Sequence, residues 1–182
     1  MAKDISKKTN YIVVTPYYPT ADSFVGNYIH DQVKVIKKLS NFNVIVVKLS
    51  TLWRQKLDFS YSFEGITVHN YQYLDLPFWI LPGIFNNLNK ILFLRFISKL
   101  IPDLSESDIV HSHVTYPAGV FANFLKEYKN IKFFIQHHSQ DIMLMNNGFF
   151  NFKKTNYSLE KKESLSKKAN RIFIQNKMIK AI

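Results

Sequence analysis

The hydrophobic positions of this chain form two patterns that alternate along the sequence. Short continuous runs of apolar and β-branched residues, such as 11–15, are typical of strands buried on both faces of a parallel sheet. Between them, as in residues 27–39, apolar positions recur every three or four residues, which predicts amphipathic helices. Strands are expected at 11–15, 43–49, 66–71, 108–113, 131–136 and 171–174, and helices at 27–39, 85–101, 117–129, 157–169 and from 177.

This alternation predicts the fold class. Strand–helix–strand units form parallel sheets covered by helices, so we expect an α/β fold, a Rossmann-like three-layer sandwich with a mainly parallel sheet. One exception is 59–63, where aromatic and small polar residues alternate before a turn at Glu64-Gly65, which predicts a hairpin with the strand that follows. The 182 residues, 47% of them hydrophobic, are expected to form a single domain over 1–182.

Residues 76–101 allow two interpretations. Pro77, Pro82 and Gly83 predict a loop, followed by a helix in which polar and apolar positions do not separate cleanly. The segment is either a mostly buried core helix or an amphipathic patch for lipid or a lipid-linked acceptor, anchored by Phe78, Trp79 and Phe85. No run of 18 apolar residues occurs, and no long apolar stretch follows the polar N-terminus, so no transmembrane helix is expected. We expect a cytoplasmic protein, and the lipid interpretation of 76–101 would make it peripheral at the inner membrane face.

The amino-acid composition narrows the kinds of functional site that this chain can form. The chain has no cysteine, which excludes disulfides, thiolate catalysis and cysteine-based metal sites. The formal net charge is +11, and residues 151–182 hold nine Lys and Arg against two Glu. Such a surface attracts phosphate groups of nucleotides, anionic lipid or nucleic acid, or is simply a solvated lysine-rich helix.

The histidines gather where predicted strands end. His111 and His113 close one strand, and His137 and His138 follow the next. Ligands of open α/β sheets bind beyond the carboxyl ends of the strands, so this placement predicts a small-molecule site, although strand histidines are as often structural. Residues two apart share a face, so His111 and His113 point the same way, whereas only one of the adjacent pair faces the cleft.

Two further positions belong to the expected site. Gly26 ends the loop between the first strand and the first helix, where backbone N–H groups and a positive helix end meet bound phosphates; alternatively it is an ordinary helix-start glycine. Asp141 either caps the next helix or orients an imidazole. A zinc site from His111, His113, His138 and Asp141 matches no standard spacing, so no metal is expected.

Four stretches of the chain carry a family resemblance when they are taken together. They are 11–19 (YIVVTPYYP) with 26–32 (GNYIHDQ), 108–113 (DIVHSH), 134–141 (FIQHHSQD), and Glu160 with 168–176 (KANRIFIQN). Together they resemble the N-terminal half of a family-four retaining glycosyltransferase of the GT-B fold. The resemblance covers nearly the whole chain, in the family's order, with Gly119 in the helix expected after 108–113. Departures from the family pattern are the missing Gly-Gly pair in the first loop, and Ser139, Asn170 and Asn176 where Gly, Asp and Ser are usual.

The resemblance implies one half of a GT-B enzyme, namely the acceptor-side domain. Its partners would be its own C-terminal domain, which binds the nucleotide-sugar and is absent from this chain, and a glycan or lipid-linked acceptor in surface polysaccharide synthesis. Gly26 would lie near the donor diphosphate and His113 near the reaction centre, with His111, His138 and Asp141 lining the cleft. The nucleotide-sugar would be a substrate, no cofactor would belong to this domain, and an anionic membrane surface would be a further partner. The domain alone would be inactive.

Two other functions compete with this one. The charge of +11 is also typical of an anion- or nucleic-acid-binding α/β module, although no recognised DNA- or RNA-binding signature occurs, so nucleic acid is not an expected partner. A hydrolase or epimerase would share the fold but not the transfer step.

Overall fold

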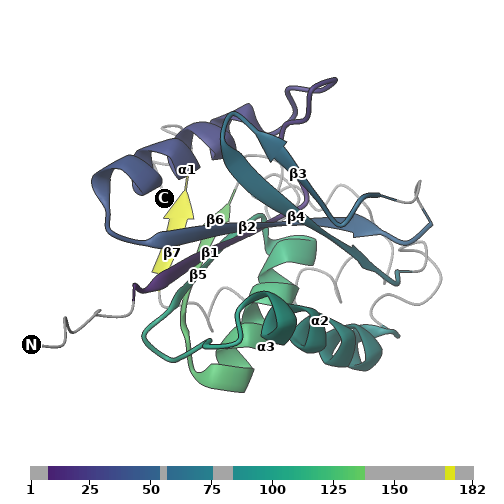
Figure 1. Cartoon of the computed structure of the whole chain (residues 1–182). Helices are drawn as coiled ribbons and strands as arrows, with labels where there is room; N and C mark the ends of the chain where they lie inside the picture. The colour runs from purple at the N-terminus through teal and green to yellow at the C-terminus, as the bar shows by residue number, and fades with distance from the viewer. Residues whose placement is uncertain (1–7, 54–56, 76–83, 138–170, 175–182) are drawn as a thin grey trace, which may run out of the picture.

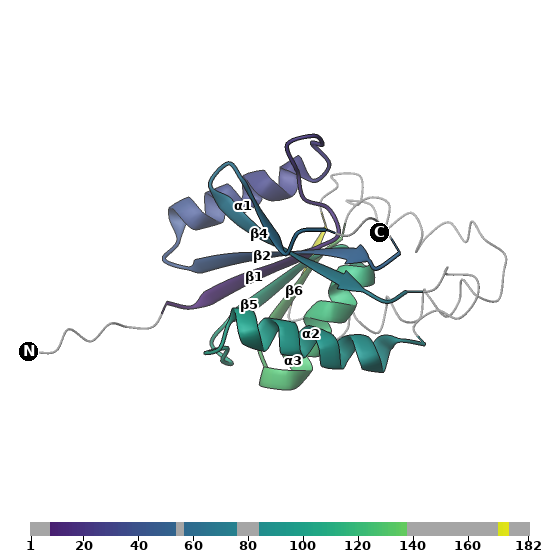
Figure 2. The same ribbon diagram turned by 45° about the vertical axis from the view of Figure 1, so that its right-hand side comes forward.

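A twisted, mainly parallel β-sheet forms the middle layer of this α/β, Rossmann-like fold (Figures 1 and 2). The computed structural model describes residues 8–53, 57–75 and 84–137, and the backbone of 171–174. Within these residues the strands are β1 Asn10–Thr15, β2 Asn43–Thr51, β3 Ser60–Phe63, β4 Ile66–Tyr73, β5 Ile109–His113, β6 Lys132–His137 and β7 Arg171–Ile174, and the helices are α1 Asn27–Leu39, α2 Asn86–Leu100 and α3 Val120–Lys129.

The order of the strands places a reversal at the centre of the sheet. Neighbouring strands run β3-β4-β2-β1-β5-β6-β7, and every pair is parallel except β3 with β4. From β1 the chain moves outward through β2 to β4, then crosses back to β5 beside β1 and moves outward on the other side. Without the hairpin strand β3, this is the strand order of the doubly wound dinucleotide-binding fold, whose ligands bind where the order reverses.

Two hydrophobic cores lie on opposite faces of the sheet. Because successive side chains of a strand alternate between faces, Ile12 and Val14 join the core under α2 and α3, while Val13 joins the core under α1. The views in Figures 1 and 2 show α1 on one side of the sheet and α2 with α3 on the other. Both cores exclude water, since Phe93 of α2 and Ile29 of α1 are fully buried.

A buried carboxylate joins the starts of the two central strands. Asp108, just before β5, accepts hydrogen bonds from the backbone N–H of Asn10 at 2.7 Å and of Ser105 at 2.8 Å. Asp108→Ala leaves both N–H groups without their acceptor, so we expect the free energy of unfolding to fall by about 2–3 kcal/mol. Urea denaturation measures it, and Glu106→Ala, at an exposed position two residues earlier, is the control. Equal losses in both variants would contradict the role of this carboxylate.

The strand that ends at His113, β5, does not lead directly into a helix. The sequence predicts a helix over 117–129, but the regular helix α3 begins at Val120, and Thr115–Gly119 forms a wide irregular turn with a cis peptide bond before Pro117. Tyr116 is extended, with φ −126° and ψ 133°, as residues before proline tend to be. The helices predicted at 157–169 and from 177 lie outside the described residues.

Candidate functional site

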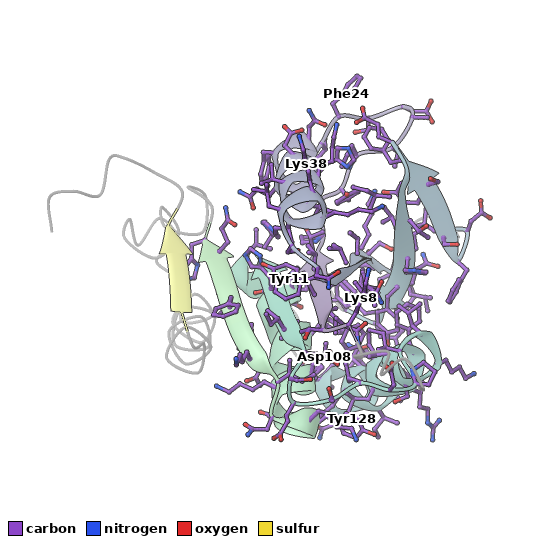
Figure 3. The ribbon with its side chains drawn as sticks, turned by 60° about the vertical axis from the view of Figure 1, so that its left-hand side comes forward. Lys8, Tyr11, Phe24, Lys38, Asp108 and Tyr128 are labelled. Carbon is purple, nitrogen blue, oxygen red and sulfur yellow. The ribbon has the colours of Figure 1, made fainter. Side chains whose placement is uncertain are left out.

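The candidate site is the carboxyl edge of β1 and β5, where the strand order reverses. At the end of β1, the fully buried hydroxyl of Thr15 donates to the carbonyl oxygen of Tyr17 at 2.9 Å and accepts from its N–H at 3.1 Å. This closed turn leads the chain off the strand into the loop that reaches α1. Phe24, near the tip of this loop, is 76% exposed and points away from the sheet (Figure 3).

Gly26 allows the loop to fold back on the start of α1. Its φ of 88° lies in the left-handed region. A Cβ atom built at Gly26 would lie 2.7 Å from the carbonyl carbon and oxygen of Tyr17 and 2.9 Å from the nitrogen of Tyr18. Only a residue without a side chain fits this approach. The first turn of α1 carries no acidic residue and no capping side chain, so its amino end keeps its positive character.

A hydrogen-bonded chain fixes the first loop to α1 and to the β3–β4 turn. The phenol oxygen of Tyr18 lies 2.9 Å from Nδ1 of the buried His30, whose Nε2 lies 3.1 Å from Glu64 Oε2. Because a carboxylate only accepts, His30 donates to Glu64, and so does Lys34 at 2.8 Å. The hydrogen bond from Lys34, and after it the one from His30, holds the pKa of Glu64 below its usual range.

The other side of the loop is held by the sheet. Lys48 of β2 donates to the carbonyl oxygen of Tyr18 at 3.0 Å, and the hydroxyl of Tyr61 donates to that of Pro19 at 2.9 Å. Burial lowers the pKa of Lys48 and raises that of Tyr61 to about 12. The path of the loop before Gly26 is therefore set by side chains of α1, β2 and β3.

His111 and His113 lie on the α1 side of β5, and their ring centroids are 4.5 Å apart. The prediction that residues two apart in this strand share a face is confirmed. His111 Nδ1 lies 2.8 Å from the hydroxyl of Tyr11, whose pKa burial raises to about 12 (Figure 3 labels Tyr11). His113 ends the strand and is 1% exposed. It thus sits at the predicted edge but beneath the surface.

The remaining predicted site residues separate into two groups. His137, the last residue of β6, is buried with its Nδ1 2.9 Å from the hydroxyl of Thr115, a residue of the turn before α3. Phe85 is partly buried, and its carbonyl oxygen accepts from Asn89 at the start of α2. The others, Phe78, Trp79, His138 and Asp141, lie outside the described residues.

Val114 is a feature of the site that the sequence does not reveal. It follows His113 directly and has φ 71° and ψ 153°, a conformation that β-branched residues very rarely adopt. Its N–H donates to the carbonyl oxygen of Gln136 on β6 at 3.0 Å. Valine is an ordinary strand residue, so nothing in the sequence indicates this strain. Backbone outliers of this kind cluster at functional sites, which adds weight to the end of β5.

No protein-family model and no curated protein sequence matches this chain. The function is therefore inferred from the residues of the site and from their arrangement. Within the described part of the chain, no three His, Asp or Glu side chains come together as metal ligands.

One pocket of about 360 Å³ lies at the opposite, amino edge of the sheet. Lys8, Lys37, Asn43 and Gly65 are among the residues that line it. It is beside the carboxyl end of α1, where the helix dipole is negative, and it touches none of the predicted site residues. We therefore give the central edge, not this pocket, the functional role.

Proposed function

We propose that this chain is the acceptor-side domain of a family-four retaining glycosyltransferase of the GT-B fold. The observation that carries the proposal is the reversal of strand order between β1 and β5, which brings the glycine that begins α1 and the histidine that ends β5 to one edge of the sheet. The order of the four matching sequence stretches supports it. The full enzyme would move a sugar from a nucleotide-sugar to a glycan or lipid-linked acceptor in surface polysaccharide synthesis.

Each residue has a stated task in this proposal. The backbone at Gly26 and the amino end of α1 bind the donor diphosphate, since helix amino ends attract anions. His113 donates a hydrogen bond to the transferred sugar. Because the side chain of His113 is 1% exposed, the residues that cover it must move before the sugar can reach it. The bond between the anomeric carbon and the phosphate oxygen breaks, and the acceptor oxygen bonds to that carbon from the same face. The acceptor proton passes to the departing phosphate.

A transfer assay on the native, full-length protein tests the proposal. We expect label from a nucleoside-diphosphate sugar to appear in a membrane lipid or glycan with the anomeric configuration retained. Free sugar or an isomerised nucleotide-sugar as the main product would instead identify a hydrolase or an epimerase. The native protein should have a mass roughly twice the 21.4 kDa of this chain, as two domains of ordinary size require.

A second candidate function rests on charge alone. The net charge of +11 favours an anion- or nucleic-acid-binding module. Binding of the 182-residue chain to random oligonucleotides, measured over a range of salt concentrations, distinguishes the two functions. Tight binding that falls steeply with salt would favour the module, whereas weak binding would favour the transferase.

A further inference from the structure

Helix α2 has a buried face and an exposed aliphatic face. Phe93 and Ile97 are fully buried against the sheet, as is nearly all of Asn89. On the opposite side, four positions at the helical spacing i, i+4, i+7 and i+8 form one stripe that begins in the turn just before α2 and runs over its first turns. Its members are Ile84, Leu88, Ile91 and Leu92, which are 56%, 43%, 51% and 39% exposed. Of the two interpretations of this segment, a mostly buried core helix is therefore wrong for α2, in which Asn89, Phe93 and Ile97 are the buried residues.

The strand ends beside the start of α2 also carry exposed apolar side chains. Asn89 donates to the carbonyl oxygen of Leu74 at 2.7 Å and accepts from its N–H at 3.0 Å, which ties the start of α2 to the end of β4. Trp53, which follows β2, donates its indole N–H to the carbonyl oxygen of Asp75, the residue after Leu74. Trp53 and Leu52 are 67% and 50% exposed, so large apolar side chains extend along this edge.

The charges of the two helices on this face of the sheet are almost all positive. Helix α2 carries Lys90, Arg95 and Lys99 and no acidic residue. The last turn of α3 adds Lys126 and Lys129, and the one acid of the two helices, Glu127, pairs with Lys90 at 2.8 Å. Five basic residues against one acidic residue give these two helices a formal charge of +4. An apolar stripe flanked by cations is typical of helices that lie in the interface of an anionic membrane.

We propose that this surface docks the protein on an anionic lipid bilayer. We name it the α2 surface and define it as Leu52, Trp53, Ile84, Leu88, Ile91 and Leu92 with the cations Arg95 and Lys99. The aliphatic side chains enter the headgroup boundary, and the cations bind lipid phosphates. Because α2 begins at the carboxyl edge of the sheet (Figures 1 and 2), docking holds the candidate site beside the membrane. The inference does not rest on sugar transfer.

Vesicle flotation of the 182-residue chain tests it. Vesicles contain phosphatidylcholine alone, or with about a third phosphatidylglycerol. The test variant carries Leu88→Ser and Ile91→Ser. The matched control carries Val35→Ser and Leu39→Ser, on α1 across the sheet, where the two side chains are 53% and 78% exposed. Circular dichroism and urea denaturation check that both variants fold.

We expect the chain to bind the anionic vesicles, the test variant to bind on the order of tenfold more weakly, and the control to bind normally. Arg95→Glu with Lys99→Glu should remove the preference for anionic lipid. No binding by the unaltered chain, equal loss in test and control, or full binding by the test variant would each overturn the proposal. The proposal would also be overturned if light scattering showed a dimer that the test variant turns into a monomer, while flotation of the variant stayed unchanged. Vesicle binding without sugar transfer would leave this inference intact and reject only the transferase.

Discussion

Gly26→Val is expected to lower the free energy of unfolding by about 4 kcal/mol, which sums the strain of a β-branched residue at positive φ and the cost of overpacking. The φ of 88° is unfavourable for any residue with a Cβ atom. The added carbon also meets backbone atoms of Tyr17 and Tyr18 at 2.7 to 2.9 Å, and backbone cannot rotate away as a flexible side chain would. The clash is relieved only if the loop that carries Tyr17 and Tyr18 moves away from the start of α1.

Gly65→Val separates the two causes. Gly65, in the β3–β4 turn, has a similar φ of 75°, but no atom lies within 4 Å of a Cβ built there. Its substitution therefore costs only the backbone strain, about 1–2 kcal/mol. Urea denaturation of the two variants gives the difference between them. Equal losses would show that the approach of Tyr17 does not constrain position 26 in solution.

The buried parallel strands could be predicted because their sequences leave little alternative. Four consecutive apolar positions at 11–14 with threonine after them suit only a strand covered on both faces, and β1 is Asn10–Thr15. The side-chain period of two placed His111 and His113 on one face without any knowledge of the neighbouring strands. Local pattern thus gives the sheet and the relative orientation of residues within one strand.

Contacts between distant segments explain most of what the sequence could not reveal. The helical pattern of residues 27–39 assigns Leu39 to the apolar face, yet Leu39 is 78% exposed and His30 is 1% exposed. His30 can be buried because Tyr18 and Glu64 satisfy both ring nitrogens, and Glu64 comes from a turn 34 residues away. In α2, apolar residues occupy all sides of the helix, so periodicity alone could not tell which of them face solvent.

Under the proposed function, His113→Ala in the two-domain transferase is expected to lower kcat on the order of 10²–10³-fold, the usual cost of removing one hydrogen-bond donor to the reacting group. KM for the nucleotide-sugar should change much less, because the proposed function has the diphosphate bind elsewhere, at the amino end of α1. His69→Ala is the control. His69 is a half-buried imidazole on β4, three strands from β5 in the sheet, and should keep the turnover of the unaltered enzyme.

Stability must be measured with this variant, because His113 is buried and the loss of its side chain leaves a cavity. A lower urea midpoint with unchanged kcat would identify His113 as a core residue and reject its role at the reaction centre. His113→Gln refines the result, since glutamine keeps a donor and much of the volume. Partial recovery of kcat by glutamine, beyond any recovery of stability, would show that the hydrogen bond acts on the reaction and not on the fold.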